Sequence, residues 1–186
     1  MARPLRVEFP GAAYHVTGRG NAGRRIYRDD GDRGRFLDLL HRVRRLRNWR
    51  CHAYCLMDNH YHLLVEIQEA GLAAGMQWLN GVYAQSFNRA GGRSGHLFQG
   101  RYHAALVQHE GHLLETARYI VLNPVRAQLC AEPRDWPWSS YRATAGEERP
   151  HPALTAGWLI EGFGGSSLAS RTARYRSFIA SGIRAT

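Results

Sequence analysis

The chain contains no lysine, so arginine alone supplies its basic residues. There are 25 of them against 15 acidic residues, which gives the 186-residue chain a formal net charge of +10. A GC-rich genome would explain why arginine replaces lysine, but it would not explain the surplus over acidic residues. An excess of this size favours binding to nucleic acid, because the planar guanidinium pairs with phosphates and with the guanine edge.

Cysteine is scarce, and long apolar runs are absent. Cys51, Cys55 and Cys130 make an odd number, and no signal-like apolar stretch follows the first charged residues. We therefore expect a reduced, cytoplasmic protein that is associated with the nucleoid. No segment approaches the ~20 apolar residues that span a bilayer, so no membrane association is expected. The 44% share of hydrophobic residues excludes a disordered chain.

The spacing of apolar residues predicts strands and helices along the first two thirds of the chain. Strands are expected over residues 12–18, 50–56, 60–67 and 102–108. Helices are expected from Asp29 or Asp30 through the apolar positions 36 to 46, from residue 72 to the Arg-Ala-Gly-Gly stop, and over 110–123. Pro124 is expected to end the third helix, because proline and the residue before it disfavour helical geometry.

This order of elements, β-α-β-β-α-β-α, predicts an α+β fold with a ferredoxin-like antiparallel sheet built from its first six members. Such a unit packs its helices on one face of the sheet, and we expect the other face to be free for binding. Residues 1–132 are interpreted as one domain. Residues 133–186, rich in proline and tryptophan and then in glycine and serine, are interpreted as a carboxy-terminal extension with short helices.

The most informative local feature is the pair His60 and His62. Side chains two residues apart on a strand point to the same face, so both imidazoles could hold one metal ion. An isolated His-x-His is more often accidental, with two unrelated surface or core histidines. A zinc site that adds Cys51, His52 and Cys55 is a further alternative, but the spacing matches no usual zinc motif, and we expect the two cysteines to face together with His52 facing away.

The third predicted helix carries a second candidate group. Tyr119 and Asn123 lie one turn apart on a polar stripe, so a phenol and a carboxamide could both reach a metal held by the histidines. The plainer interpretation is a half-buried tyrosine with a solvated hydroxyl.

Several motifs together resemble a known family. The relevant runs are Leu56-Met57-Asp58-Asn59-His60-Tyr61-His62, Phe98-Gln99-Gly100-Arg101-Tyr102, Tyr119-Ile120-Val121-Leu122-Asn123-Pro124-Val125-Arg126 and Trp136-Pro137-Trp138-Ser139-Ser140-Tyr141. In this order they resemble the single-tyrosine HUH transposases, and most of all the REP-associated tyrosine transposases. The likeness extends through roughly residues 8 to 142.

The resemblance implies a nuclease domain over residues 1–132 that cuts single-stranded DNA beside REP-like hairpins and rejoins it through a 5′-phosphotyrosine intermediate. It implies that His60 and His62 bind the metal, that Tyr119 is the nucleophile and that Asn123 is the third ligand. Mg²⁺ or Mn²⁺ is the expected ion, because the nitrogen ligands favour manganese in affinity and the greater abundance of magnesium favours Mg²⁺. We expect Pro124 to hold Asn123 away from helical geometry, so Gln108 and His112 are reserve ligands.

Two other functions stay open at this point. A protein with the same fold could bind hairpin DNA as a regulator without cutting it, although the presence of His60, His62 and Tyr119 favours an enzyme. The other alternative is a zinc-stabilised RNA-binding domain. The active unit is expected to be a monomer or a homodimer.

Candidate DNA contacts are spread over four regions. The glycine-containing loop with Arg19, Asn21, Arg24 and Arg25 is expected to approach bases, because glycine lets the backbone come close. The arginines of the first helix, among them Arg42 and Arg45, are expected to track phosphates. Arg101, at the start of the fourth strand, is a further contact, and Tyr102 or Trp138 could provide a surface on which a base stacks.

Overall fold

A computed structural model describes residues 8–183. Its centre is a four-stranded antiparallel sheet with the order β2-β3-β1-β4. The strands are β1 Ala13–Arg19, β2 Trp49–Leu56, β3 His60–Ile67 and β4 His103–Val107. Two helices connect them, α1 Asp30–Leu46 and α2 Leu72–Ala90, with a short 3-10 turn, η1 Asn21–Gly23, after β1. The predicted ferredoxin-like α+β fold is therefore confirmed.

Both connecting helices begin at a side-chain carboxylate. The Asp29 side chain accepts a hydrogen bond of 2.9 Å from the Asp32 backbone N–H, as expected of the residue that caps α1. The carboxylate of Glu8 accepts hydrogen bonds from the backbone N–H groups of Gly71, Leu72 and Ala73 at the start of α2. These bonds satisfy donors that the first turn of a helix leaves free.

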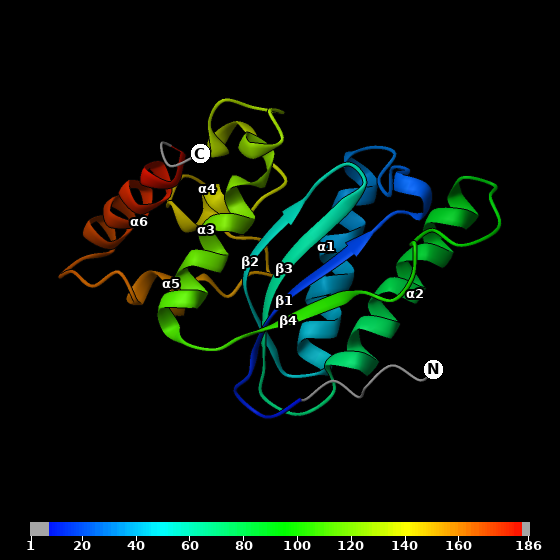
Figure 1. Ribbon diagram of the computed structural model, residues 1–186, viewed down its shortest axis with the longest axis horizontal. Helices are drawn as coiled ribbons and strands as arrows, with labels where there is room; N and C mark the ends of the chain where they lie inside the picture. The colour runs from blue at the N-terminus through cyan, green and yellow to red at the C-terminus, as the bar shows by residue number, and fades with distance from the viewer. Residues whose placement is uncertain (1–7, 184–186) are drawn as a thin grey trace.

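The two faces of the sheet support separate apolar cores. Alternate residues such as Val16 and Leu63 point towards α1 and α2, whereas Ala13 and Leu64 point to the opposite face. That opposite face is covered in large part by α3 Glu110–Arg126 and by the carboxy-terminal segment (Figure 1). The expectation of a free second face is therefore wrong for most of its area.

The carboxy-terminal segment packs as part of the second core and along the edge of β2. Its elements are η2 Pro133–Asp135, α4 Tyr141–Thr144, α5 Ala156–Glu161 and α6 Leu168–Ile183. The backbone N–H of Leu56 donates to the carbonyl of Trp138 at 2.8 Å, and that of Thr155 donates to the carbonyl of Cys51 at 2.7 Å. The segment thus satisfies backbone groups that an open edge strand would expose.

An irregularity in β2 changes where its cysteines point. The pairing with β3 shifts between Cys51 and Ala53, as in a β-bulge. Cys51 therefore packs in the core under α1 and α2, whereas Cys55 packs in the core under α3. The expectation that these two side chains face together is wrong, and they cannot share a zinc ion.

The helix α3 continues through Pro124 to Arg126 and does not end before the proline. Proline removes one backbone hydrogen bond, but the last turn is held by hydrogen bonds from Ala127 N–H to the Asn123 carbonyl and from Leu129 N–H to the Pro124 carbonyl, both 2.9 Å. Asn123 is therefore helical, contrary to expectation. Within residues 8–183, no helix has the length and apolar character needed to cross a membrane.

The packing of α2 on β2 depends on a glycine. A Cβ atom at Gly75 would lie 2.2 Å from Cζ2 of the buried Trp49. We expect Gly75→Ala to lower the free energy of unfolding by about 1–3 kcal/mol, because the indole would have to move within a packed core. Urea titrations measure this change.

Gly34 in α1 is the matched control, because a Cβ atom there would meet no atom within 4 Å. Gly34→Ala should stabilise the protein by about 0.5–1 kcal/mol through helix propensity. Equal effects of the two substitutions would show that the contact with Trp49 does not limit the packing.

Candidate active site

The side chains of His60 and His62 lie next to each other on the face of the sheet towards α3. Their ring centroids are 5.0 Å apart with an angle of 78° between the ring planes. His62 is buried and His60 is half-buried. The two-residue period of β3 produces this arrangement, which leaves both rings at one edge of the second core.

The turn before β3 orients the imidazole of His60. Oδ1 of Asn59 lies 2.7 Å from His60 Nδ1, and Nδ2 of Asn59 donates to the Gly23 carbonyl at 3.0 Å. Because the amide oxygen can only accept, His60 must donate from Nδ1, and its Nε2 keeps a free lone pair. The turn therefore selects the tautomer that a metal ligand needs.

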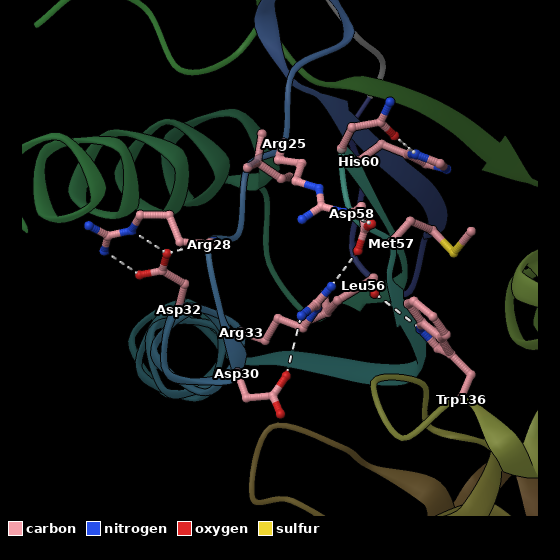
Figure 2. Close-up of polar contacts among 12 residues, drawn as sticks. Arg25, Arg28, Asp30, Asp32, Arg33, Leu56, Met57, Asp58, His60 and Trp136 are labelled. Atoms are coloured by element: carbon pink, nitrogen blue, oxygen red, sulfur yellow. Dashed lines mark hydrogen bonds and ion pairs between the residues drawn. The ribbon is translucent and has the colours of Figure 1, made fainter. Parts of the chain in front are cut away.

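The same turn is fixed by Asp58, which lies between two arginines. Its carboxylate is 2.6 Å from Arg33 of α1 and 3.3 Å from Arg25 of the loop after β1 (Figure 2). Its backbone carbonyl accepts from the N–H of Ile26 at 2.9 Å. The loop after β1, the turn before β3 and α1 are thereby joined at the point where His60 begins its strand.

His62 is oriented by a residue from the neighbouring strand. His15 Nε2 and His62 Nδ1 are joined by a hydrogen bond of 2.9 Å, and the two rings are stacked with centroids 5.2 Å apart. Nε2 of His62 is buried and has no hydrogen-bond partner. A buried polar atom without a partner is costly in a protein, and this one is free to bind a metal.

Tyr119 of α3 closes this group of rings. Its ring packs edge-on against His15 at 5.7 Å and against His62 at 5.8 Å, measured between centroids. It is 40% exposed, so solvent and a nucleic acid can reach it. Cζ of Arg126 lies 5.0 Å from the centre of the tyrosine ring, which brings a positive charge to the same place.

Asn123 follows Tyr119 by one turn of α3. Its Nδ2 donates to the Tyr119 carbonyl at 2.9 Å, which leaves Oδ1 available as a ligand. Within residues 8–183, no three His, Cys, Asp or Glu side chains form a group that could hold a metal ion. Two imidazole nitrogens with an amide oxygen fit the ligand preferences of Mn²⁺ and Mg²⁺ better than those of a structural zinc ion.

Their surroundings favour the neutral form of His15, His60 and His62. Burial, with smaller effects from neighbouring imidazoles, lowers the pKa of His62 to about 3 and that of His15 to about 4. Burial and the charge of Arg19 lower the pKa of His60. Protons therefore do not compete for the free ring nitrogens near pH 7, as metal ligation requires.

The structure brings part of the predicted DNA contacts to this site. Arg19 pairs with His60 across β1 and β3, and Asn21, Arg24 and Arg25 continue from it as an exposed loop. Arg101 is exposed just before β4, not within it. This end of the sheet therefore combines the histidine pair with several exposed guanidinium groups.

Other predicted contacts lie elsewhere or are covered. Arg42 and Arg45 are exposed on α1, on the opposite side of the sheet from Tyr119. Tyr102 is buried in the first core. Trp138 is half-buried, with Cζ of Arg33 at 5.7 Å from its ring centre. Tyr102 therefore does not present the open surface for base stacking that was expected of it, whereas Trp138 stays a predicted contact.

The reserve ligands do not join the histidine pair directly. His112 is exposed on the first turns of α3 and is close enough for its charge to lower the pKa of His15. Gln108 is exposed after β4, in a hollow that also contains Trp158.

Two residues of the group had no predicted role, His15 and Arg126. Alternation along β1 places His15 on the same face as Ala13 and Thr17, and this pattern is visible in the sequence. What the sequence does not contain is the register that sets His15 diagonally opposite His62. Arg126 was part of the motif that ends α3, but its approach to Tyr119 depends on the helix continuing past Pro124.

The buried histidines predict a dependence of stability on pH. Their folded pKa values lie below the unfolded value of about 6.5, so the unfolded state binds more protons between that pH and about 4 for His15. The free energy of unfolding should therefore be highest above pH 6.5 and should fall as the pH falls through this window. Urea titrations at several pH values measure the slope, which His15→Gln should reduce. An unchanged slope in His15→Gln would contradict the assignment.

Comparison with known proteins identifies the family and the fold of the chain. The family described as "Transposase IS200 like" matches residues 9–123. A solved structure of a REP-associated tyrosine transposase bound to a REP hairpin superposes with a TM-score of 0.66 and 17% identity, and covers 78% of this chain and 86% of that one.

A Deinococcus radiodurans R1 structure, provisionally described as that of a transposase, gives a TM-score of 0.45 and 17% identity over 69% of this chain and 92% of that one. No curated protein matches the chain. Since the family match spans more than half of the sequence and includes the histidine pair and Tyr119, the chain belongs to the IS200-like transposases, and it shares the fold of a REP-associated tyrosine transposase.

Proposed function

We propose that this transposase cuts and rejoins single-stranded DNA next to hairpins, through a covalent bond between Tyr119 and a 5′ phosphate. The observation that carries the proposal is the packing of an accessible tyrosine against His62, whose buried Nε2 has no partner. A nucleophile and a prospective metal ligand are thus in contact. The similar structure contains a REP hairpin, and a hairpin of that kind is the proposed partner of this chain.

We propose that His60 Nε2, His62 Nε2 and Asn123 Oδ1 hold Mg²⁺ or Mn²⁺. The cation would supply a Lewis acid that polarises the scissile phosphate and offsets the charge of the transition state. The surrounding residues prepare its ligands. Asn59 fixes the ring of His60. We propose that His62 donates a hydrogen bond from Nδ1–H to Nε2 of His15, the tautomer in which Nε2 of His62 is unprotonated and can bind the metal.

In the cleavage step, the phenolic oxygen of Tyr119 forms a bond to phosphorus, and the bond from phosphorus to the 3′ oxygen breaks. The phenolic proton is lost to solvent, and the released 3′ oxygen takes up a proton. A phenol has an ordinary pKa near ~10, so the reaction depends on its surroundings. Arg126, above the ring, holds the tyrosine and offers a contact for the phosphate. The phosphotyrosine bond retains the energy for rejoining to another 3′ hydroxyl.

The DNA is proposed to enter over the end of the sheet where Arg19 lies beside His60. Asn21, Arg24, Arg25 and Arg101 are exposed near that entry and suit contacts to phosphates and base edges. Arg42 and Arg45 lie on the other side of the sheet, so they are proposed as contacts to a more distant part of the hairpin.

Replacing Tyr119 by phenylalanine should abolish cleavage and leave hairpin binding within a few-fold, because only the attacking oxygen is lost. A nicking assay on labelled hairpin DNA with Mn²⁺, together with a binding titration, measures both. Tyr141→Phe, a change in a buried tyrosine of the second core, is the control and should cleave normally. Cleavage by Tyr119→Phe at the normal rate would exclude Tyr119 as the nucleophile.

Loss of a metal ligand should reduce the cleavage rate more than loss of the residue that orients that ligand. His60→Ala and His62→Ala should reduce cleavage beyond the roughly 10–100-fold expected for His15→Ala, since outer hydrogen-bond partners have effects of that size. Excess Mn²⁺ should restore cleavage by Asn123→Ala more fully than cleavage by His60→Ala or His62→Ala, because water can replace the amide oxygen. Initial nicking rates over a Mn²⁺ titration measure the order. Normal cleavage in the presence of EDTA would contradict the metal assignment.

A further inference from the structure

A cavity of about 710 Å³ opens between α2 and the segment of residues 95–102 that leads into β4. Its volume lies within the range of roughly 300–1,000 Å³ that small-molecule sites occupy. Four carboxamide side chains line it, and no acidic residue does. They are Gln77, Asn80, Gln85 and Asn88. The cavity lies on the α2 side of the sheet and has no part in the chemistry described above.

Two of these carboxamides are held in defined orientations. Asn80 Oδ1 accepts a hydrogen bond of 2.9 Å from the hydroxyl of the buried Tyr61, so its NH₂ group remains to donate. Asn88 Nδ2 donates to the Gly95 carbonyl at 2.9 Å, so its carbonyl oxygen remains to accept. Donors and acceptors of amide type match the edges of nucleobases.

An aromatic ring and a positive charge complete the lining. Phe98 is half-buried and packs edge-on against Tyr61, with centroids 6.1 Å apart, which fixes the position of its ring. Arg101 is exposed and also lines the cavity. Aromatic rings bind unstacked bases and arginine binds the adjoining phosphates.

Backbone hydrogen bonds connect this cavity to the entry of the active site. The N–H of Asn21 donates to the Leu97 carbonyl at 2.8 Å, and the N–H of Gln99 donates to the Arg19 carbonyl at 2.9 Å. Gly20 and Phe98 form an isolated β-bridge. Since Arg19 also pairs with His60, a strand leaving the histidine pair over this loop arrives at the cavity.

Gly81 is the feature that neither helix stability nor packing explains. It lies in the middle of α2, is exposed, and lines the cavity. A Cβ atom there would meet nothing within 4 Å, and its φ is not in the left-handed region. Glycine destabilises the interior of a helix, and at this position its missing side chain leaves the cavity open.

We propose that this cavity binds one unstacked nucleobase of the DNA strand whose phosphate is brought to Tyr119. The base stacks on Phe98, its edge meets the carboxamides of α2, and Arg101 contacts the neighbouring phosphate. The proposal rests on the function proposed above and adds a place where the strand is read away from the catalytic group.

The test uses a fluorescein-labelled DNA hairpin with a single-stranded flank whose sequence has been enriched for binding to the wild-type protein. Each flank nucleotide is replaced in turn by an abasic site. For the wild type, at least one abasic position should weaken binding by about 10-fold or more, the scale of one lost stacking contact. Gly81→Leu should weaken binding of the intact DNA similarly, and the same abasic position should then cost nothing further.

Gly34→Leu is the control, because Gly34 also lies in a helix with open space around it but does not line the cavity. Gly34→Leu should bind the intact DNA and the abasic DNA with the same affinities as the wild type. Gln77→Phe fills the cavity from a position one turn before Gly81 and should reproduce the effect of Gly81→Leu. Thermal melts of all variants check that they fold.

The outcomes separate this inference from the proposed function. One contradicting result is that Gly81→Leu and Gln77→Phe both bind intact DNA with wild-type affinity. The other is that both variants still lose affinity at every abasic position that weakens binding of the wild type. Either result would show that no base occupies the cavity. If the wild type enriches no hairpin sequence, the proposed function fails, and the base-binding site fails with it. If the wild type cleaves the DNA, but Gly81→Leu loses affinity at the same abasic positions as the wild type, only the assignment of the cavity is overturned.

Discussion

The antiparallel register of β3 against β1 is the constraint on which the site depends. It sets His60 opposite Arg19 and His62 opposite Thr17, with His15 diagonally across from His62. A slip of β3 by one residue would turn His60 and His62 to the other face of the sheet, away from His15 and Arg19. The loop after β1 and the turn at Asp58 hold this register through Arg25, Arg33 and backbone hydrogen bonds, so the contacts that stabilise this end of the sheet also position the histidine pair.

The two faces of the sheet have different tasks. The face under α1 and α2 is closed by large apolar side chains and supplies stability. On the other face, α3 and the carboxy-terminal segment bury most of the surface but stop at the histidines, where Tyr119 stays accessible. Burial lowers the pKa of the imidazoles and so favours their neutral form, and the exposure of Tyr119 leaves its ring open to solvent. The surplus of arginine then supplies the attraction for DNA that the apolar site lacks.

Local patterns predicted the elements and the histidine face, because the period of a strand and the spacing of a helix are properties of neighbouring residues. The same is true of Tyr119 and Asn123, one turn apart. The sequence could not indicate the bulge after Cys51 or the contact between His15 and His62, since both depend on pairing between distant strands. Pro124 was misjudged because the turn after it is stabilised by hydrogen bonds that propensity does not describe. The covering of the second face by residues 133–183 depends on tertiary packing alone.

The central claim is that the oxygen of Tyr119 becomes bonded to DNA. The most direct measurement is mass spectrometry of proteolytic peptides after the protein has been incubated with hairpin DNA and Mn²⁺ and then denatured. The account predicts that the peptide containing Tyr119 carries the mass of a 5′-linked nucleotide, while the peptides with Tyr61 and Tyr102 are unmodified. A nucleotide on another residue, or cleaved DNA without any modified peptide, would contradict it.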